Sequence, residues 1–349
     1  MRNSKPVITV FDKTQRTHAP REFIVSGKPQ PIPEIPERID MLLEGVRRIG
    51  GPVVEPPAIS LDTLAVVHDR RYITFLTTLW ERWHRMPDAA ETPSANVFAL
   101  GRSSLPPAGY PDSVVGQCGY HLGDGSCPVT ADTFAAACAS AATAAHGAAL
   151  MQNGERVVYA LCRPPGHHAA ADMAAGFCYF NNAALAAELL TRAGKRAAIL
   201  DIDVHHGNGT EAIFYDRADV LTVSIHAHPK RFYPFFWGYE DERGRGAGEG
   251  FNLNLPLERG TTLAPYRIAL DLALTRVADF RPDVLLLAAG LDIAIDDPFK
   301  GFAIATQEFE TIGRQIASLG LPMLVVQEGG YPSENLGANL ASLLSGLLT

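Results

Sequence analysis

The residues with the clearest potential for chemistry lie between 199 and 210, in the stretch ILDIDVHHGNGT. Asp201 and Asp203 are separated by one residue, and the adjacent pair His205 and His206 follows directly. The apolar run RAAIL leads into them and is typical of a buried strand. Burying ionisable side chains costs several kcal/mol each unless something compensates their charge. A bound dication would supply that compensation, because it lets neighbouring carboxylates stay ionised.

Asp203 and His205 are two positions apart, and side chains at that spacing point the same way in a β-strand. We therefore expect their carboxylate and imidazole to be two ligands of one divalent metal. Asp292, which follows the apolar run DVLLLAAG, is the third candidate. Three N/O ligands with one open position are typical of a catalytic Zn²⁺ site. A lone Asp or His is more often a cap or a hydrogen-bonded core residue, but this set on successive strand ends favours the metal.

Further reactive groups follow other apolar runs. His167 and His168 come after RPPG, and Tyr331 comes after QEGG. A histidine beside a metal can take a proton from water and later protonate a leaving amine. A tyrosine hydroxyl can donate a hydrogen bond to a developing oxyanion. Together with a metal that polarises a carbonyl, these residue types are consistent with hydrolysis of an amide.

The elements that must position these groups alternate along the chain. Six short apolar runs read as parallel strands buried on both faces: 7–11, 156–161, 196–203, 220–226, 283–290 and 322–330. Five segments read as helices: 130–151, 181–194, 261–279, 306–319 and 334–348. This alternation predicts one α/β domain over residues 1–349 with a mainly parallel sheet, whose ligands bind at the carboxyl ends of the strands.

Two stretches do not fit the alternation. Residues 86–126 carry many Pro, Gly and Ser and little periodicity, and a connection this long is often a lid, a binding loop or an oligomer contact. An idle surface insertion is the alternative. Residues 227–250 are a second irregular stretch that is rich in aromatic side chains.

Composition excludes several other classes. The net charge is −8 and there is no Lys/Arg block, so neither nucleic acid nor an anionic membrane is an expected partner. The N-terminus has no apolar signal-peptide region, and no run approaches the roughly 20 apolar residues of a membrane span. Five scattered cysteines indicate a reducing compartment rather than a disulfide framework. We therefore expect a cytoplasmic enzyme.

The longer motifs are specific to one family. They are RPPGHHA, GFCYFNNAA, ILDIDVHHGNGT, TVSIHAHP, AAGLDI and EGGYP, in that order between about 160 and 332. They resemble the zinc-dependent family of histone deacetylases, deacetylase-like amidohydrolases and acetylpolyamine amidohydrolases. Weaker similarity in PIPEIPERI and HDRRYITFL extends the resemblance towards the N-terminus. The resemblance implies the three-layer α/β/α arginase-deacetylase fold, one Zn²⁺ per chain and hydrolysis of an acyl amide.

The resemblance also assigns roles to individual residues. It implies that Asp203, His205 and Asp292 hold the zinc ion. It implies that His167 and His168 are the catalytic pair, that Asp201 is bonded to the first of them, and that Tyr331 polarises the substrate carbonyl. Asn208 stands where many deacetylases carry an aspartate, so we expect the pKa of His168 to be lower than in those relatives.

The remaining implied sites are the substrate channel and a structural cation site. By the same resemblance, the channel is lined by Gly176, Phe177, Tyr233 and Gly329, with a core aromatic as the alternative for Tyr233. A K⁺ ion is implied beside Asp201, Asp203, His205 and Ser224.

The N-terminal stretch TQRTHAPREFIVSGKPQ and the 86–126 insertion are similar to the acetylpolyamine amidohydrolase branch, in which that insertion builds a homodimer over the active site. A polyamine substrate needs anionic groups for its distal ammonium groups. The insertion offers four acids, Asp88, Glu91, Asp112 and Asp124, and the 232–239 stretch FYPFFWGY is aromatic. We therefore expect a small acylated amine or another small amide as substrate, with a more apolar pocket.

Four alternatives stay open at this point. They are a protein-lysine deacetylase, a hydrolase of xenobiotic aryl or alkyl amides, a ureohydrolase of the arginase type and a non-catalytic acyl-amine binding protein. The sequence also leaves open whether the native metal is Zn²⁺ or Fe²⁺.

Overall fold

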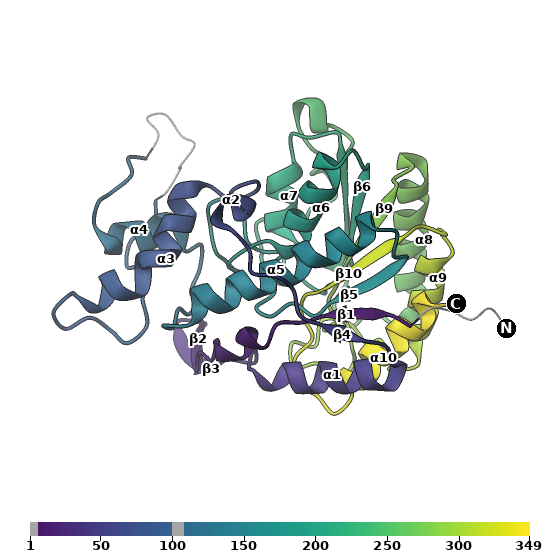
Figure 1. The fold of residues 1–349 in the computed structure, drawn as a ribbon, viewed down its shortest axis with the longest axis horizontal. Coiled ribbons are helices and arrows are strands. Elements are labelled where there is room, and N and C mark those ends of the chain that lie inside the picture. Colours follow the sequence, from purple (N-terminus) through teal and green to yellow (C-terminus); the bar gives the residue numbers. More distant parts are fainter. Residues whose placement is uncertain (1–5, 100–107) are drawn as a thin grey trace.

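The computed structural model describes residues 6–99 and 108–349, and an eight-stranded sheet lies at its centre (Figure 1). The strands follow the order β4-β1-β5-β10-β9-β6-β7-β8, and all pairings between them are parallel. Their bounds are β1 Ile8–Val10, β4 Val53–Val54, β5 Val157–Ala160, β6 Ala197–Asp201, β7 Val220–Ala227, β8 Asn252–Leu257, β9 Val284–Ala289 and β10 Met323–Gln327. Two further strands, β2 Glu22–Val25 and β3 Lys28–Pro31, form a separate antiparallel hairpin.

Helices cover both faces of the sheet. Their bounds are α1 Glu37–Ile49, α2 Leu61–Leu64, α3 Arg70–His84, α4 Val114–His121, α5 Thr133–Gln152, α6 Asn182–Arg192, α7 Asn208–Phe214, α8 Leu263–Phe280, α9 Glu308–Ala317 and α10 Leu336–Leu347. Short 3₁₀ turns occupy Lys13–Thr17 and Gly246–Gly248. One face packs against α1, α8, α9 and α10, and the other against α5, α6 and α7. The predicted three-layer α/β/α architecture is confirmed.

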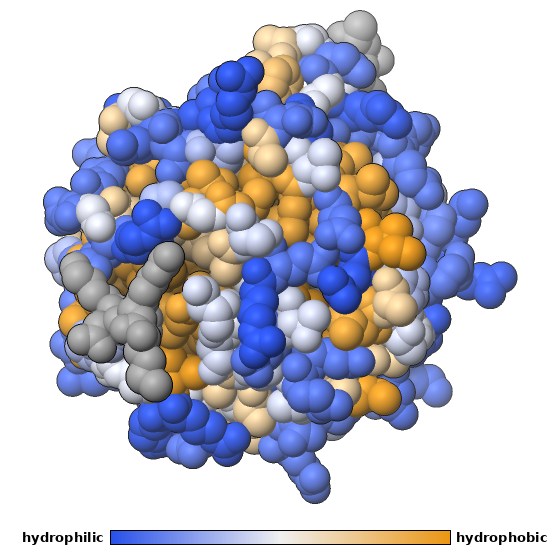
Figure 2. Space-filling model, turned by 90° about the vertical axis from the view of Figure 1, so that its right-hand side faces the viewer, coloured by the Kyte–Doolittle hydropathy of each residue, from blue (hydrophilic) through white to orange (hydrophobic). Residues whose placement is uncertain are grey.

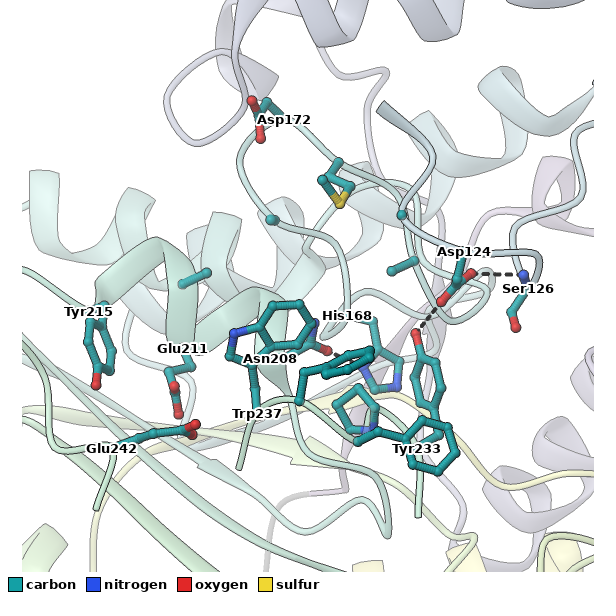
Figure 3. Close-up of a pocket in the computed structure, with 18 of the residues that line it drawn as sticks. Asp124, Ser126, His168, Asp172, Asn208, Glu211, Tyr215, Tyr233, Trp237 and Glu242 are labelled. Carbon is teal, nitrogen blue, oxygen red and sulfur yellow. Dashed lines mark hydrogen bonds between the residues drawn. The ribbon is translucent and has the colours of Figure 1, made fainter. Parts of the chain in front are cut away.

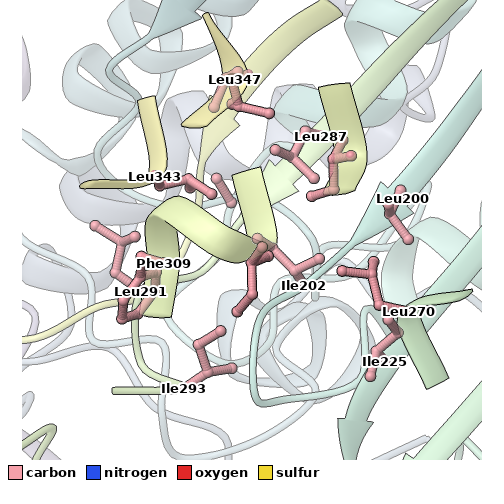
Figure 4. Close-up of a cluster of buried hydrophobic side chains, with 14 of the residues drawn as sticks. Leu200, Ile202, Ile225, Leu270, Leu287, Leu291, Ile293, Phe309, Leu343 and Leu347 are labelled. Carbon is pink, nitrogen blue, oxygen red and sulfur yellow. The ribbon is translucent and has the colours of Figure 1, made fainter. Parts of the chain in front are cut away.

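Strand alternation explains how one sheet serves two cores. Leu200 and Leu287 point into the core shared with α8, α9 and α10, where Leu270, Phe309 and Leu343 meet them (Figure 4). Their neighbours, such as Ile199 and Leu286, point to the opposite core beneath α5 and α6. Because both faces are covered, the central strands are almost continuously apolar, which is why they could be recognised in the sequence.

Helix α5 is long and apolar enough, by length and composition alone, to cross a membrane. It packs against α6, β5 and β10, with 61% of its most apolar window buried inside the protein. Its alanines Ala144 and Ala148 lie in the core between the sheet and the layer of α5, α6 and α7. Helix α5 is therefore placed as the core helix of this fold.

The structure differs from the sequence prediction in several elements, and α1, α2, α3, α7, β2, β3 and β4 were not predicted. The strand predicted over 196–203 ends at Asp201, so Asp203 and His205 lie in the turn that follows it. The 86–126 stretch contains α4, because Val114, Cys118 and Leu122 recur every four residues and bury against α3. In Figure 1, α3 and α4 lie side by side away from the sheet. Residues 100–107 of that insertion lie outside the described part.

The parallel strand β8 was missed because buried and partly buried residues alternate along it, so it has no continuous buried apolar run.

The surface on the side of α8, α9 and α10 is mixed. Figure 2 shows hydrophobic areas there that are interrupted by hydrophilic side chains. Two exposed apolar residues of α8 are Ile268, which is 66% exposed, and Leu272, which is 57% exposed.

Candidate active site

The predicted reactive groups meet at the carboxyl edge of the parallel sheet. Strands β5, β10, β9 and β6 are neighbours, and each is followed by one of the expected motifs. His167 follows β5, Tyr331 follows β10, Asp292 follows β9 and Asp203 follows β6. The edge gathers them because all four strands run in the same direction.

Asp203, His205 and Asp292 form a buried cluster of three possible metal ligands, with one donor atom of each within 4.8 Å of the others. The Nδ1 atom of His205 lies 3.0 Å from Asp203 Oδ1 and 3.1 Å from Asp292 Oδ2. The strand alternation expected for Asp203 and His205 is replaced by two successive turns. Asp201 Oδ1 accepts from the Asp203 N–H at 3.0 Å, and Asp203 Oδ1 accepts from the His205 N–H at 2.9 Å.

The electrostatics of this cluster fit a cation. Burial, helped by the charge of Asp203, raises the pKa of Asp292 to about 8. Burial disfavours the charged form of His205, but the two carboxylates overcome it and raise its pKa to about 9. Two carboxylates and one imidazole therefore converge where positive charge is needed, and N and O donors of this kind suit Zn²⁺. The residues present fit the metal that the family implies.

Gly329 completes the wall of the cluster. A Cβ atom at this position would lie 2.3 Å from Asp292 Oδ2 and 2.5 Å from Asp203 Oδ2. The Gly329 N–H donates to Asp203 Oδ2 at 2.7 Å. Only a glycine lets the backbone approach the carboxylates closely enough for that bond.

The adjacent histidines have different partners. His167 Nδ1 lies 2.8 Å from Asp201 Oδ2, and His168 Nδ1 lies 2.7 Å from the amide oxygen of Asn208. Burial by itself favours the neutral form of both rings and so acts to lower both pKa values. The charges of Asp201 and Asp203 overcome this for His167 and raise its pKa to about 10. The pKa of His168 stays well below its ordinary value, because burial and the charges of His167 and His205 all lower it.

Tyr331 is 4% exposed and is held by its surroundings. Its backbone N–H donates to Asp297 Oδ2 at 3.0 Å. The guanidinium of Arg38 lies 4.8 Å from the centre of the Tyr331 ring, and it donates to the carbonyl oxygens of Glu328 at 2.7 Å and Gly330 at 2.6 Å. The edge of Phe299 packs on the same ring at 4.8 Å.

Phe177 and Tyr233 contact different residues of the site. The ring of Phe177 contacts Tyr331 at 5.9 Å, and the ring of Tyr233 meets His168 edge-on at 4.9 Å. Gly176, with φ +52°, has no room for a side chain, since a Cβ there would lie 2.3 Å from His168 Cδ2. Gly176 and Tyr233 therefore lie against His168, and Phe177 lies against Tyr331, while their role as a substrate channel stays a prediction.

A hollow of about 1060 Å³ opens beside His168 and Asn208 (Figure 3). Trp237, which is 50% exposed, lies across it, and Glu211 and Glu242 point towards each other at its far side. Burial, with the neighbouring charge of Glu211, raises the pKa of Glu242 to about 7. Among the described residues, no Lys or Arg pairs with either carboxyl group.

Of the four residues expected to hold K⁺, Asp203 and His205 belong to the metal cluster, and the other two are Asp201 and Ser224. Asp201 and Ser224 are paired across β6 and β7, and both line a small hollow of about 10 Å³. Ser224 Oγ hydrogen-bonds His226 Nδ1 at 2.8 Å. The K⁺ ion stays a prediction.

Several residues of the site were missed in the sequence. Phe232 stacks on His205 at 5.0 Å, and Phe299 meets the same ring edge-on at 5.1 Å. Glu328 Oε2 accepts from the N–H groups of Gly166 at 2.6 Å and His167 at 3.0 Å. A signal existed for Arg38, since it lies in the PIPEIPERI motif, and for Glu328, which opens EGGYP.

Arg38 belongs to a buried ionic cluster that anchors this part of the site. Its guanidinium lies 2.7 Å from Glu34, and Arg163 contacts the same carboxylate at 2.8 Å. All three side chains are fully buried. Removing one member would leave uncompensated charge in the interior, so the cluster fixes the loop that carries Tyr331.

Comparison with known proteins shows the family of this chain. The family model described as histone deacetylase domain matches residues 32–347. An acetylpolyamine amidohydrolase of Burkholderia pseudomallei is 43% identical over 341 residues, covering 97% of this chain and 98% of that protein. Acetylpolyamine amidohydrolase 2 of Pseudomonas aeruginosa is 40% identical over 352 residues, with the same two coverages.

Solved structures give the same result. The crystal structure of acetylpolyamine aminohydrolase from Burkholderia pseudomallei matches with a TM-score of 0.93 at 43% identity, over 97% of this chain and 98% of that one. The HDA15 HD domain matches with a TM-score of 0.80 at 28% identity, over 99% of this chain and 90% of that one. The chain therefore belongs to the histone deacetylase domain family of deacetylases and amidohydrolases, with acetylpolyamine amidohydrolases as homologues over nearly its whole length.

Proposed function

We propose that this chain is a metal-dependent hydrolase of the amide bond in a small acylated amine. One observation carries the proposal. The three candidate ligands Asp203, His205 and Asp292 converge beside the catalytic candidates His168 and Tyr331 in one buried site. A core that needed only packing would have no use for two carboxylates facing each other there.

Asp203, His205 and Asp292 would hold one divalent cation, Zn²⁺ in our proposal. When bound, such an ion polarises a carbonyl group and lowers the pKa of a water molecule. A K⁺ ion beside Asp201, Asp203, His205 and Ser224 is the second cofactor that we propose, supported by the pairing of Asp201 with Ser224.

The side chains around the cluster divide the remaining work. Burial and the neighbouring charges of His167 and His205 hold the pKa of His168 well below its ordinary value, so it can accept a proton from water and return it to the leaving amine. His167 keeps a positive charge through Asp201 and stabilises negative charge that develops on the substrate. Tyr331 donates its hydroxyl to the substrate oxygen. Phe177 and Tyr233 flank the acyl chain and exclude water.

The proposed substrate is small, and two features support this. The 86–126 insertion carries α4, whose Tyr120 lines the hollow next to His168, and we propose that the insertion forms a homodimer contact that narrows the entrance. The hollow beside His168 combines aromatic Trp237 with the carboxyl groups of Glu211 and Glu242. That combination suits an amine that carries a second, protonated nitrogen, because a cation gains from both an aromatic face and a carboxylate.

The remaining parts of the proposal concern organisation and place of action. We propose residues 1–349 as one catalytic domain, which is supported by α1 and α5 to α10 covering the two faces of one eight-stranded sheet. All five cysteines carry free thiols, which supports action in a reducing compartment such as the cytoplasm.

A panel of substrates tests the proposal. Purified protein is assayed with N-acetylputrescine, neutral alkyl and aryl acetamides and an acetyl-lysine peptide, while light scattering gives the solution mass. We expect the highest kcat/KM with a small acylated amine and the mass of a dimer. The alternative of a protein-lysine deacetylase would be favoured by a monomer that hydrolyses the peptide best. The alternative of a xenobiotic amide hydrolase, favoured by exposed Phe236 and Trp237, would be supported by preference for the aryl amide.

A further inference from the structure

Asp124 lies between α4 and α5, at the end of the 86–126 insertion. Its carboxylate accepts three hydrogen bonds. Oδ2 accepts from the Tyr233 hydroxyl at 2.5 Å and from the Gly176 N–H at 3.3 Å, and Oδ1 accepts from the Ser126 N–H at 2.8 Å. One side chain therefore contacts both sides of the acyl channel, and Figure 3 shows it aimed at the Tyr233 hydroxyl.

The first side of the channel needs such support because its backbone is strained. Gly176 has φ +52° and the next residue, Phe177, has φ +69°. A left-handed conformation at a phenylalanine costs on the order of 1–3 kcal/mol and persists only when neighbouring contacts hold it. Those contacts come from the end of the insertion. Ser126 accepts from the Phe177 N–H at 3.1 Å, and the Gly123 N–H donates to the Ala174 carbonyl at 2.8 Å.

The second side is held through a single atom. The Tyr233 hydroxyl has Asp124 as its hydrogen-bond partner among the described residues. The Tyr233 ring meets His168 edge-on at 4.9 Å and contacts Phe235, which is half exposed, at 6.3 Å. The bond to Asp124 therefore fixes how far this ring leans over the channel.

We infer that Asp124 is a positioning residue through which the insertion sets the width of the acyl channel, by holding Tyr233 and the Gly176–Phe177 turn with one carboxylate. This inference rests on the proposed function, because it takes Phe177 and Tyr233 as the channel walls. It goes further by naming the property that the insertion controls. The insertion selects the acyl group as well as the size of the whole substrate.

The expected consequence is a change in acyl selectivity. A well-fitted apolar pocket discriminates one methylene by roughly 10-fold or more. Releasing Tyr233 lets its ring swing away, so the longer acyl chains meet less resistance. The preference for acetyl over butyryl should therefore shrink by about 10-fold, mostly through a better kcat/KM for butyryl.

The experiment compares N-acetyl, N-propionyl and N-butyryl versions of one amine with wild type, Asp124→Ala, Asp124→Asn and Tyr233→Phe. Asp124→Ala should lose most of the acetyl preference, and Tyr233→Phe should lose part of it. Asp124→Asn should recover part, since its amide oxygen keeps one acceptor. The double variant Asp124→Ala/Tyr233→Phe should be no less selective than Asp124→Ala alone, because both changes remove the same contact.

Asp112→Ala is the matched control, since Asp112 is an exposed acid of the same insertion that does not contact the channel. Its acyl preference should equal that of wild type. Bound metal is measured in every variant. An unchanged acyl ratio in folded, metal-loaded Asp124→Ala would overturn the inference, and if that variant does not fold, an unchanged ratio in Tyr233→Phe would do the same. Failure of wild type to hydrolyse any of the three amides would instead overturn the proposed function.

Discussion

Replacing Tyr331 by phenylalanine removes one hydroxyl group from the wall of the site. The ring of Tyr331 is packed between Phe177, Phe299 and the guanidinium of Arg38, at 5.9, 4.8 and 4.8 Å. A phenylalanine ring can keep all three contacts. The hydroxyl has no hydrogen-bond partner among the described residues, so its loss leaves no protein group unsatisfied there.

The structure therefore predicts two effects of very different size. The free energy of unfolding should change by no more than about 0.5 kcal/mol, because no buried partner is lost. Turnover should fall by about 10²–10³, which is the cost of removing one oxyanion donor in an enzyme that hydrolyses peptides. That fall corresponds to about 2.7–4 kcal/mol of transition-state stabilisation.

The assay follows release of the free amine from a small acetylated amine at saturating concentration. Metal content and urea unfolding are measured on the same preparations. Tyr239→Phe is the control, since the Tyr239 hydroxyl binds the Phe235 carbonyl at 2.9 Å, away from the metal cluster. Near wild-type turnover in folded, metal-loaded Tyr331→Phe would refute the reasoning, and so would an equal loss in Tyr239→Phe.

Three further predictions follow. Dialysis against a strong chelator should abolish hydrolysis, and added Zn²⁺ or Co²⁺ should restore it. Elemental analysis of Asp292→Ala should find no bound metal. Full activity of metal-free protein would contradict the metal dependence. Burial lowers the pKa of His18 from 6.5 to about 4, so the unfolded chain binds the proton more tightly than the folded protein. The free energy of unfolding should therefore fall as the pH falls from 6.5 to about 4. Urea titrations of His18→Gln should show a shallower loss of stability over this range than those of wild type. Glu242→Gln keeps an acceptor for the Gly238 and Tyr239 N–H groups but removes the negative charge of the side chain. The value of kcat/KM should therefore fall several-fold for N-acetyl diamines and stay constant for neutral amides. An equal fall for both substrates would count against a cation subsite.

The sheet and the gathering of the site could be predicted because both depend on local sequence patterns. Parallel strands buried on two faces leave continuous apolar runs, and the reactive residues follow those runs directly. The ends of β5, β6, β9 and β10 were therefore placed at one edge before their order was known. The order itself, with β10 between β5 and β9, depends on contacts between distant segments and has no local signal.

The contacts of the supporting residues could not be predicted for the same reason, although Arg38 lies in the PIPEIPERI motif. Arg38 binds the Gly330 carbonyl across 292 positions of sequence, and Asp124 binds Tyr233 across 109. Neither residue lies on an apolar run or in a spacing that indicates its partner. The orientation of Asp203 and His205 was predicted from strand geometry, but turns made by aspartate side chains produce it instead.

The two adjacent histidines show how a single partner can separate the roles of similar groups. His167 and His168 are both buried, and their rings are 4.0 Å apart. The Nδ1 atom of one faces a carboxylate, and that of the other faces the amide of Asn208. Because an amide cannot stabilise an imidazolium as a carboxylate does, the positive charge stays on His167 and disfavours a second charge on His168. In the proposed function, the pair supplies a fixed positive charge and a neutral proton acceptor side by side.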